Sequence, residues 1–125
     1  MSIAIWCILI AGLMPLAAIA VAKIDKTYDN DNPRDWLAKR EGYARRAHAA
    51  HLNSFEAFPL FAAGVLVATM LNVKGATIDM LAVIFIVARI AYIWCYISDY
   101  ATPRSLIWFV GMGASIGLFV AAGMK

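Results

Sequence analysis

The sequence predicts an all-α membrane protein: one domain, residues 1–125, folded as a four-helix transmembrane bundle with an antiparallel up-down order. Hydrophobic residues make up 63% of the chain, whereas soluble globular domains contain roughly 45–50% apolar residues. These residues are gathered into four long runs, and a spanning helix needs about 20 of them. The runs are separated by short connections, which place neighbouring helices antiparallel. We expect helices over residues 2–22, 34–73, 78–98 and 104–124.

The first run, from Ser2 to Ala22, carries no charge. Its alanine-rich end would suit a signal-peptidase site, but it lacks a positively charged start and exceeds the usual length of a signal core. We therefore expect it to be retained as a transmembrane helix.

The second helix is expected to begin at a turn-like polar stretch. Asn32 suits a helix cap and Pro33 suits the first helical position. An amphipathic stretch around Trp36 then leads into the apolar run that ends at Val73. The sequence thus predicts one continuous helix whose first part lies on the cytoplasmic side and whose second part spans the membrane.

The third and fourth helices are bounded by short polar turns. Asp79 is placed to help start the third helix, whose apolar run is interrupted only by Arg89. Pro103 is expected just before the last helix. Cys7 and Cys95 fall inside predicted helices without metal-like spacing and are expected to be small buried side chains.

Basic residues are distributed unevenly between the two sides of the predicted bundle. Seven of the eleven lie between the first and second runs, and Arg104 falls on the same side. The opposite side has only Lys74 and Lys125. The positive-inside rule then places both termini outside the cytoplasm. This distribution explains the net charge of +3 without a nucleic-acid partner, and membrane lipids are the expected surroundings.

Two polar stripes interrupt the predicted membrane helices. At about 100° per residue, four side chains of the second helix fall on one side, and four of the third helix share another. Ionisable groups in hydrocarbon are costly and usually mark a function or a partner. The first set is Arg45, Arg46, Asn53 and Glu56, and the second is Arg89, Tyr92, Tyr96 and Asp99.

These stripes allow more than one interpretation. Arginine, amide and phenol groups suit a polar, anionic ligand. Alternatively, Glu56 and Arg89 form a buried salt bridge that holds two helices together, and the tyrosines only pack. Two histidines make a poor metal site, and no metal is expected. The chain has no Ser-His-Asp arrangement, glycine-rich phosphate loop or acidic dyad.

The motifs resemble those of the MAPEG family, the membrane-associated proteins in eicosanoid and glutathione metabolism. The run from Arg46 to Pro59, with its Asn-x-x-Glu-x-x-Pro spacing, resembles the second-helix signature. The Arg-x-x-Tyr-x-x-x-Tyr run from Arg89 to Tyr96, and the later Pro-Arg-Ser, resemble the third and fourth helices. The resemblance covers essentially the whole chain.

The resemblance implies a homotrimer that binds glutathione, as co-substrate, between subunits near the cytoplasmic side. Asn53 and Glu56 would hold the glutathione backbone, and Tyr92 and Tyr96 would line the pocket. Arg104 would be catalytic, because it would stabilise the thiolate that attacks a hydrophobic electrophile or reduces a lipid hydroperoxide. By this assignment the glutathione-binding residues are Arg45, Arg46, Asn53, Glu56, Arg89, Tyr92, Tyr96 and Ser105.

One position departs from the family pattern. Characterised transferases carry an arginine four residues before the motif asparagine, where this chain has Ala49. Arg45 and Arg46 lie one turn earlier. The sequence therefore favours a glutathione transferase or peroxidase, with two alternatives: a non-catalytic relative that binds a lipid or other anionic ligand, or a structural subunit. The alanine-rich composition and the short loops are typical of a bacterial inner-membrane protein.

Overall fold

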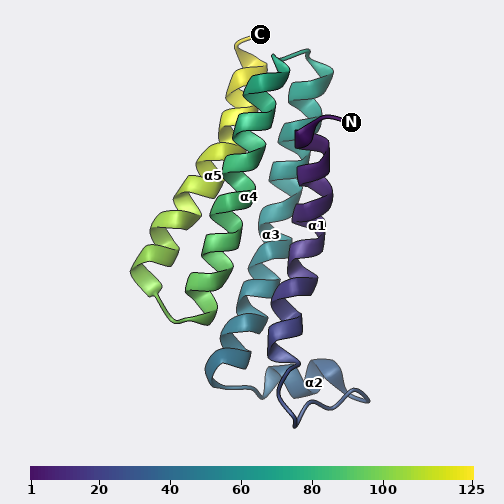
Figure 1. The fold of residues 1–125 in the computed structure, drawn as a ribbon, viewed down its shortest axis with the longest axis vertical. Helices are drawn as coiled ribbons and strands as arrows, with labels where there is room; N and C mark the ends of the chain where they lie inside the picture. Colours follow the sequence, from purple (N-terminus) through teal and green to yellow (C-terminus); the bar gives the residue numbers. More distant parts are fainter.

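The computed structural model describes residues 1–125 as five helices joined by turns (Figure 1). Four of them are long and apolar enough to cross a membrane, and α2 is a short helix between the first two. The expected all-α architecture is confirmed, and the four long helices have the length and apolar composition that the predicted crossings require. The helices are α1 (Ile3–Ala22), α2 (Pro33–Ala38), α3 (Gly42–Met70), α4 (Gly75–Ile97) and α5 (Ala101–Gly123).

The long helices form two pairs. Helix α1 packs along α3, and α5 packs along α4, while α3 also contacts both α4 and α5. Figure 1 shows both termini at the end where α3 turns into α4. At the opposite end, where α2 lies, the α4–α5 pair diverges from the α1–α3 pair. Most of the candidate site residues discussed below lie on the diverging part of α4 and α5, and one, Asn53, lies on α3.

The bundle core is built by close packing between α3, α4 and α5. The rings of Phe61 and Phe85 stack with centroids 3.9 Å apart, and Val65 and Leu118 are completely buried. Gly64 permits this approach, because a Cβ atom there would lie 3.1 Å from the Cβ of Leu118. Lipid tails are as apolar as these side chains, so tight packing rather than removal from water stabilises the bundle.

A second, smaller cluster fixes α2 against the end of the bundle. Trp36 and Leu37 are buried together with residues of α1 and α3. Thr27 is the polar centre of this cap, because its hydroxyl accepts hydrogen bonds from Trp36 Nε1 at 3.3 Å and Arg40 Nη1 at 3.1 Å. The Arg40 guanidinium also lies 4.5 Å from the centre of the Trp36 ring system. Residues 23–41 thus form an ordered cap rather than a loose connection.

The continuous helix expected over residues 34–73 is wrong. The chain forms α2 and α3 with a break at residues 39–41, and α3 ends at Met70. Gly42 has a φ of +64°, a left-handed conformation that glycine adopts without steric cost. Arg40 Nε donates to the carbonyl of Trp36 at 3.1 Å, which satisfies an acceptor that a continuing helix would use. The turn redirects the chain from the cap into the membrane.

Two other helix starts also differ from expectation. Helix α4 begins at Gly75, so Asp79 lies inside it and accepts a hydrogen bond from the backbone N–H of Ala4 at 2.8 Å. Asp79 therefore satisfies the start of α1 instead of the start of its own helix. Helix α5 begins at Ala101, and Pro103 lies in its first turn, where a missing N–H breaks no helical bond.

Candidate functional site

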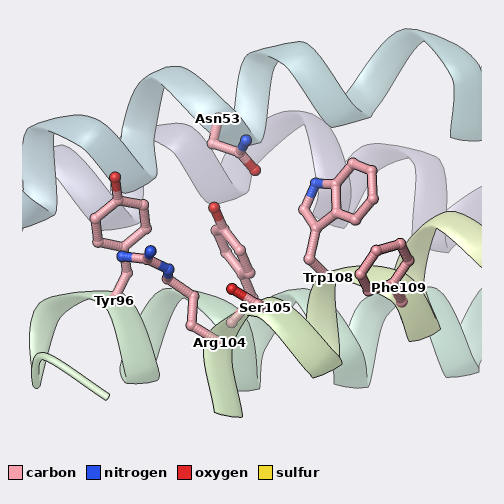
Figure 2. A pocket seen from close by; sticks show the side chains of 7 residues that line it. Asn53, Tyr96, Arg104, Ser105, Trp108 and Phe109 are labelled. Carbon is pink, nitrogen blue, oxygen red and sulfur yellow. The ribbon is translucent and has the colours of Figure 1, made fainter. Parts of the chain in front are cut away.

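A polar cavity of about 240 Å³ lies between α3, α4 and α5 at the diverging end of the bundle. Figure 2 shows that Asn53 projects from α3 toward side chains contributed by α4 and α5. The cavity is lined by Asn53, Tyr92, Tyr96, Arg104, Ser105, Trp108 and Phe109. Five of the nine residues expected at the site are brought together here.

Helical spacing explains why these side chains share one space. Tyr92 and Tyr96 are four residues apart on α4, and Arg104 and Trp108 are four apart on α5, so each pair projects from one face of its helix. The turn at residues 98–100 joins the two helices antiparallel. Asp99 in this turn has a φ of +66°. The α4–α5 hairpin therefore presents phenols and a guanidinium toward Asn53.

Two arginines and two tyrosines form a continuous row. The Arg104 guanidinium lies 4.3 Å from the centre of the Tyr96 ring, and that of Arg89 lies 4.1 Å from the centre of the Tyr92 ring. The two tyrosine rings meet edge to face with centroids 5.7 Å apart. A cation over an aromatic face is attracted to the ring quadrupole. Arg104 is thereby held at the cavity.

Asn53 is incompletely satisfied by the protein. Its Nδ2 donates to Glu56 Oε2 at 3.5 Å, whereas its Oδ1 is buried and has no hydrogen-bond partner. A buried acceptor without a partner is costly. The amide oxygen is therefore available to an N–H or O–H group of a ligand in the cavity. Ser105 is already engaged, because its hydroxyl donates to the carbonyl of Ala101 at 3.2 Å.

Arg45 and Arg46 do not line the cavity, so the expectation that they form part of it is corrected. Arg45 is exposed and pairs at 3.3 Å with Glu41, the residue just before α3. Arg46 Nε donates to the carbonyl of Ile97 at 2.9 Å, where it satisfies the C-terminal end of α4. Helical periodicity placed both arginines on the stripe with Asn53, but the Glu41 carboxylate and the Ile97 carbonyl draw their side chains away.

Glu56 and Arg89 also lie outside this cavity. Both line a smaller neighbouring cavity of about 110 Å³. Glu56 and Arg89 form no ion pair. The chain has two ion pairs, Lys39–Asp35 and Arg45–Glu41, and both are exposed. The alternative of a Glu56–Arg89 salt bridge is therefore wrong for this conformation. Asp99, the last residue of the third-helix stripe, lies in the turn before α5.

Trp108 and Phe109 line the cavity but were missed in the sequence. Their rings meet edge to face with centroids 5.1 Å apart. A signal existed, because positions 108 and 109 follow Arg104 and Ser105 by four residues and so share their face. Both lie within the apolar run of the last helix, and no role was predicted for them from the sequence. They give the polar cavity an aromatic side.

The arrangement offers anion-binding and hydrogen-bonding groups rather than metal ligands. No group of three or more His, Cys, Asp or Glu side chains is close enough to hold a metal ion. His51, which lies off the stripe, has its Nδ1 2.7 Å from the carbonyl of Pro15 and so joins α3 to α1. A guanidinium, two phenols and an amide beside two aromatic rings suit a polar anion next to an apolar molecule.

Comparison with known proteins gives two findings. The MAPEG family model matches residues 3–124, which is nearly the whole chain. None of the curated proteins matches the sequence.

Proposed function

Because the chain belongs to the MAPEG family, we propose that it is a glutathione-dependent transferase or peroxidase that acts on hydrophobic electrophiles within the membrane. Its four membrane-length helices and its family support an integral membrane protein, in a family named for eicosanoid and glutathione metabolism. The observation that carries the proposal is the position of Arg104. Its guanidinium lines the polar cavity beside two phenols and a free amide oxygen.

The chemical groups that line the cavity match those that glutathione would need. Arg104 and the tyrosines supply groups for carboxylates and for a thiolate, and Asn53 Oδ1 is free to accept an N–H of the peptide. A guanidinium beside a thiol lowers its pKa by favouring the charged form. In this proposal Arg104 holds the sulfur as thiolate, and Trp108 and Phe109 hold the apolar reactant beside it. The sulfur then bonds to the electrophilic carbon as the leaving group departs with its electron pair.

A homotrimer is part of this proposal. Glu56 is exposed on α3 although it lies in a membrane-spanning helix. A carboxylate facing lipid is costly, so a neighbouring copy that covers this face would remove the penalty. The neighbour would also be a source for the second cation that Arg45 and Arg46 do not provide in this chain. Native mass spectrometry from detergent is expected to give a trimer, and a monomer would contradict this part.

One observation favours the second candidate, a non-catalytic protein that binds a lipid or other anion. Arg104 is the one cationic side chain that lines the cavity, and Ala49 stands where transferases of the family carry arginine. A site with a single cation suits a ligand with one negative charge better than glutathione, which has two carboxylates.

Thiolate formation separates the two candidates. The protein is purified in detergent, and glutathione thiolate absorbance and conjugation of 1-chloro-2,4-dinitrobenzene are measured for wild type, Arg104→Ala and Arg45→Ala. We expect Arg104→Ala to lower kcat/KM by about 100-fold, the typical loss of a group that stabilises developing or full negative charge. Arg45→Ala is the matched control, because Arg45 is exposed and engaged with Glu41. If wild type neither binds glutathione nor turns over, the enzyme proposal fails.

A further inference from the structure

The last turn of α4 leaves backbone carbonyls without a helical partner, as every helix end does. The turn at residues 98–100 satisfies those of residues 94–96, because its N–H groups donate to them at 2.8 to 3.2 Å. The left-handed φ of Asp99 permits this pattern of bonds. The carbonyl of Ile97 is left over, and Arg46 Nε on α3 donates to it at 2.9 Å. A side chain from another helix therefore completes the end of α4.

The bond from Arg46 is the only side-chain hydrogen bond between α3 and the α4–α5 hairpin, and no ion pair joins them. The other hydrogen bond between the two helix pairs, from Ala4 to Asp79, lies at the opposite end of the bundle. Ile97 adds an apolar contact, because its side chain packs against the cluster that contains Trp36. Figure 1 shows that the hairpin diverges from the α1–α3 pair at this end. Arg46 therefore joins the two pairs where they diverge.

The polar cavity lies across the same division. Asn53 is the only residue of α3 that lines it, and the other lining residues belong to the α4–α5 hairpin. Arg46 precedes Asn53 by seven residues, which is about 10 Å along α3, and Ile97 directly follows Tyr96. The separation between α3 and the hairpin is thus the width of the cavity. A change in this separation would move Asn53 relative to Tyr96 and Arg104.

We propose that Arg46 is a positioning residue for the polar cavity: its bond to the Ile97 carbonyl fastens the hairpin to α3 and sets the separation between Asn53 and Arg104. Without this bond, the hairpin samples open arrangements in which one ligand cannot reach both sides of the cavity. A ligand that binds only the closed arrangement then has its apparent affinity reduced in proportion to the closed fraction. The effect on glutathione rests on the proposed function, whereas the fastening of the hairpin does not.

Hydrogen exchange of the turn at residues 98–100, followed by mass spectrometry of the full chain in detergent without glutathione, tests the fastening. Arg46→Met is expected to speed this exchange by about tenfold or more, the usual loss of a hydrogen bond from a charged group. Arg45→Met removes an equal charge at the neighbouring exposed position and should exchange like wild type. Arg46→Lys keeps a charged donor and should retain most of the protection. Exchange around Phe61, in the bundle core, should be the same in all four proteins.

Conjugation kinetics distinguish a positioning role from a role in the chemical step. Arg46→Met should raise the KM for glutathione by about tenfold and leave kcat within about twofold, because saturating glutathione selects the closed arrangement. For the same reason, saturating glutathione should return the exchange of the turn in Arg46→Met to the rate of the liganded wild type. Arg46→Lys should restore most of the wild-type KM, and Arg45→Met should leave it unchanged.

Three results would overturn the proposal. The first is equal exchange of the turn in wild type and Arg46→Met. The second is faster exchange throughout Arg46→Met, including the core around Phe61, which would give Arg46 a general role in stability. The third is a lower kcat with an unchanged KM, which would place Arg46 in the chemical step. The first exchange measurement contains no glutathione, so it decides the fastening by Arg46 even if the conjugation test of Arg104 fails.

Discussion

The contact between Arg104 and Tyr96 joins a cation to the face of an aromatic ring at the mouth of the polar cavity. The guanidinium lies 4.3 Å from the ring centre, and no ion pair competes for it. Cation–π pairs contribute about 0.5–1 kcal/mol at exposed positions and more where water is excluded. The ring of Tyr96, more than its hydroxyl, should therefore hold Arg104 where its guanidinium can stabilise a thiolate.

Tyr96→Leu tests this role of the ring. Without the aromatic face, Arg104 gains rotamer freedom and stabilises a thiolate less well, so the pKa of bound glutathione thiol should rise. A spectroscopic titration of the thiolate should show the shift toward higher pH, with kcat reduced about tenfold. Tyr96→Phe keeps the ring and is the control, with a smaller effect. Equal shifts in the two variants would assign the role to the hydroxyl instead.

At the residue scale, helical periodicity placed Asn53, Tyr92 and Tyr96 on their stripes. The family resemblance added Arg104 and Ser105, and all five side chains line one cavity. Long side chains could not be placed this way. Arg46 reaches the carbonyl of Ile97 across a tertiary contact between residues far apart in sequence, which no single-helix projection contains.

At the scale of elements, the cap formed by residues 23–41 depends on one hydroxyl. Thr27 Oγ1 accepts from Trp36 and Arg40 and donates to Asp25 Oδ1 at 2.8 Å. The backbone N–H of Thr27 donates to the same oxygen at 2.8 Å. These two bonds lower the pKa of the Asp25 carboxyl below its usual value. Four hydrogen bonds therefore meet at this residue.

Thr27→Val should loosen the cap without disturbing the membrane helices. Valine preserves the shape but leaves Trp36 Nε1 and Arg40 without their shared acceptor. We expect cleavage by trypsin at Lys26 and Arg34 to become about tenfold faster, while the far-ultraviolet circular dichroism stays unchanged. Thr27→Ser retains the hydroxyl and should resemble wild type. Unchanged proteolysis of Thr27→Val would mean that the apolar contacts of Trp36 and Leu37 suffice.

The same cap should respond to acid in a defined direction. The pKa of Asp25 is lowered in the folded cap, so its bonds to Thr27 contribute order at pH values above the ordinary aspartate pKa. That contribution is lost as the pH falls through the lowered value. Tryptic sites are unsuitable in acid, so pepsin cleavage of wild type and Asp25→Asn is the measurement. The two proteins should differ at mildly acidic pH and converge in strong acid.

Gly64 lies at a close approach between α3 and α5. A Cβ there would meet Leu118 Cβ at 3.1 Å and Phe119 Cε2 at 3.2 Å. Gly64→Ala should therefore lower the free energy of unfolding by about 1–3 kcal/mol, the usual cost of overpacking. Gly113→Ala is the matched control on α5, because nothing lies within 4 Å of its added Cβ. Thermal unfolding in detergent should give a lower midpoint for Gly64→Ala than for Gly113→Ala. Equal midpoints would show that α3 and α5 can move apart at little cost.

Element boundaries illustrate what a single sequence leaves open. Apolar runs located all four membrane helices, because run length is a direct requirement of the bilayer. The break before Gly42 was missed, because the amphipathic pattern continues across it and the turn depends on a φ of +64° and on the docking of Trp36. Asp79 was assigned to the wrong helix start, since its partner, Ala4, comes from the other end of the chain.

At the scale of the whole molecule, charge asymmetry is the feature that should orient the bundle. Residues 23–46 carry seven of the eleven basic side chains, and Figure 1 places the α1–α2 connection and the α4–α5 turn at the same end. Arg104 follows the latter turn. The opposite end, with both termini, has Lys74 and Lys125. Positive charge near short loops retains them in the cytoplasm, so the polar cavity should open toward the cytoplasmic side, where glutathione is plentiful.

Reporter fusions in a bacterial host test this orientation. Alkaline phosphatase fused after Lys125 should be active and green fluorescent protein at the same point dark, because the C-terminus is expected outside the cytoplasm. Replacing Lys23, Lys26, Arg34, Lys39 and Arg40 with glutamine should reduce the bias and give mixed reporter signals. Replacing Asp25, Asp29, Asp31 and Asp35 with asparagine is the control, since acidic residues contribute little to the rule. If the C-terminal green fluorescent protein fusion of wild type is fluorescent, the Arg104 cavity lies on the outer side, away from cytoplasmic glutathione. That result would contradict both the predicted topology and the transferase proposal.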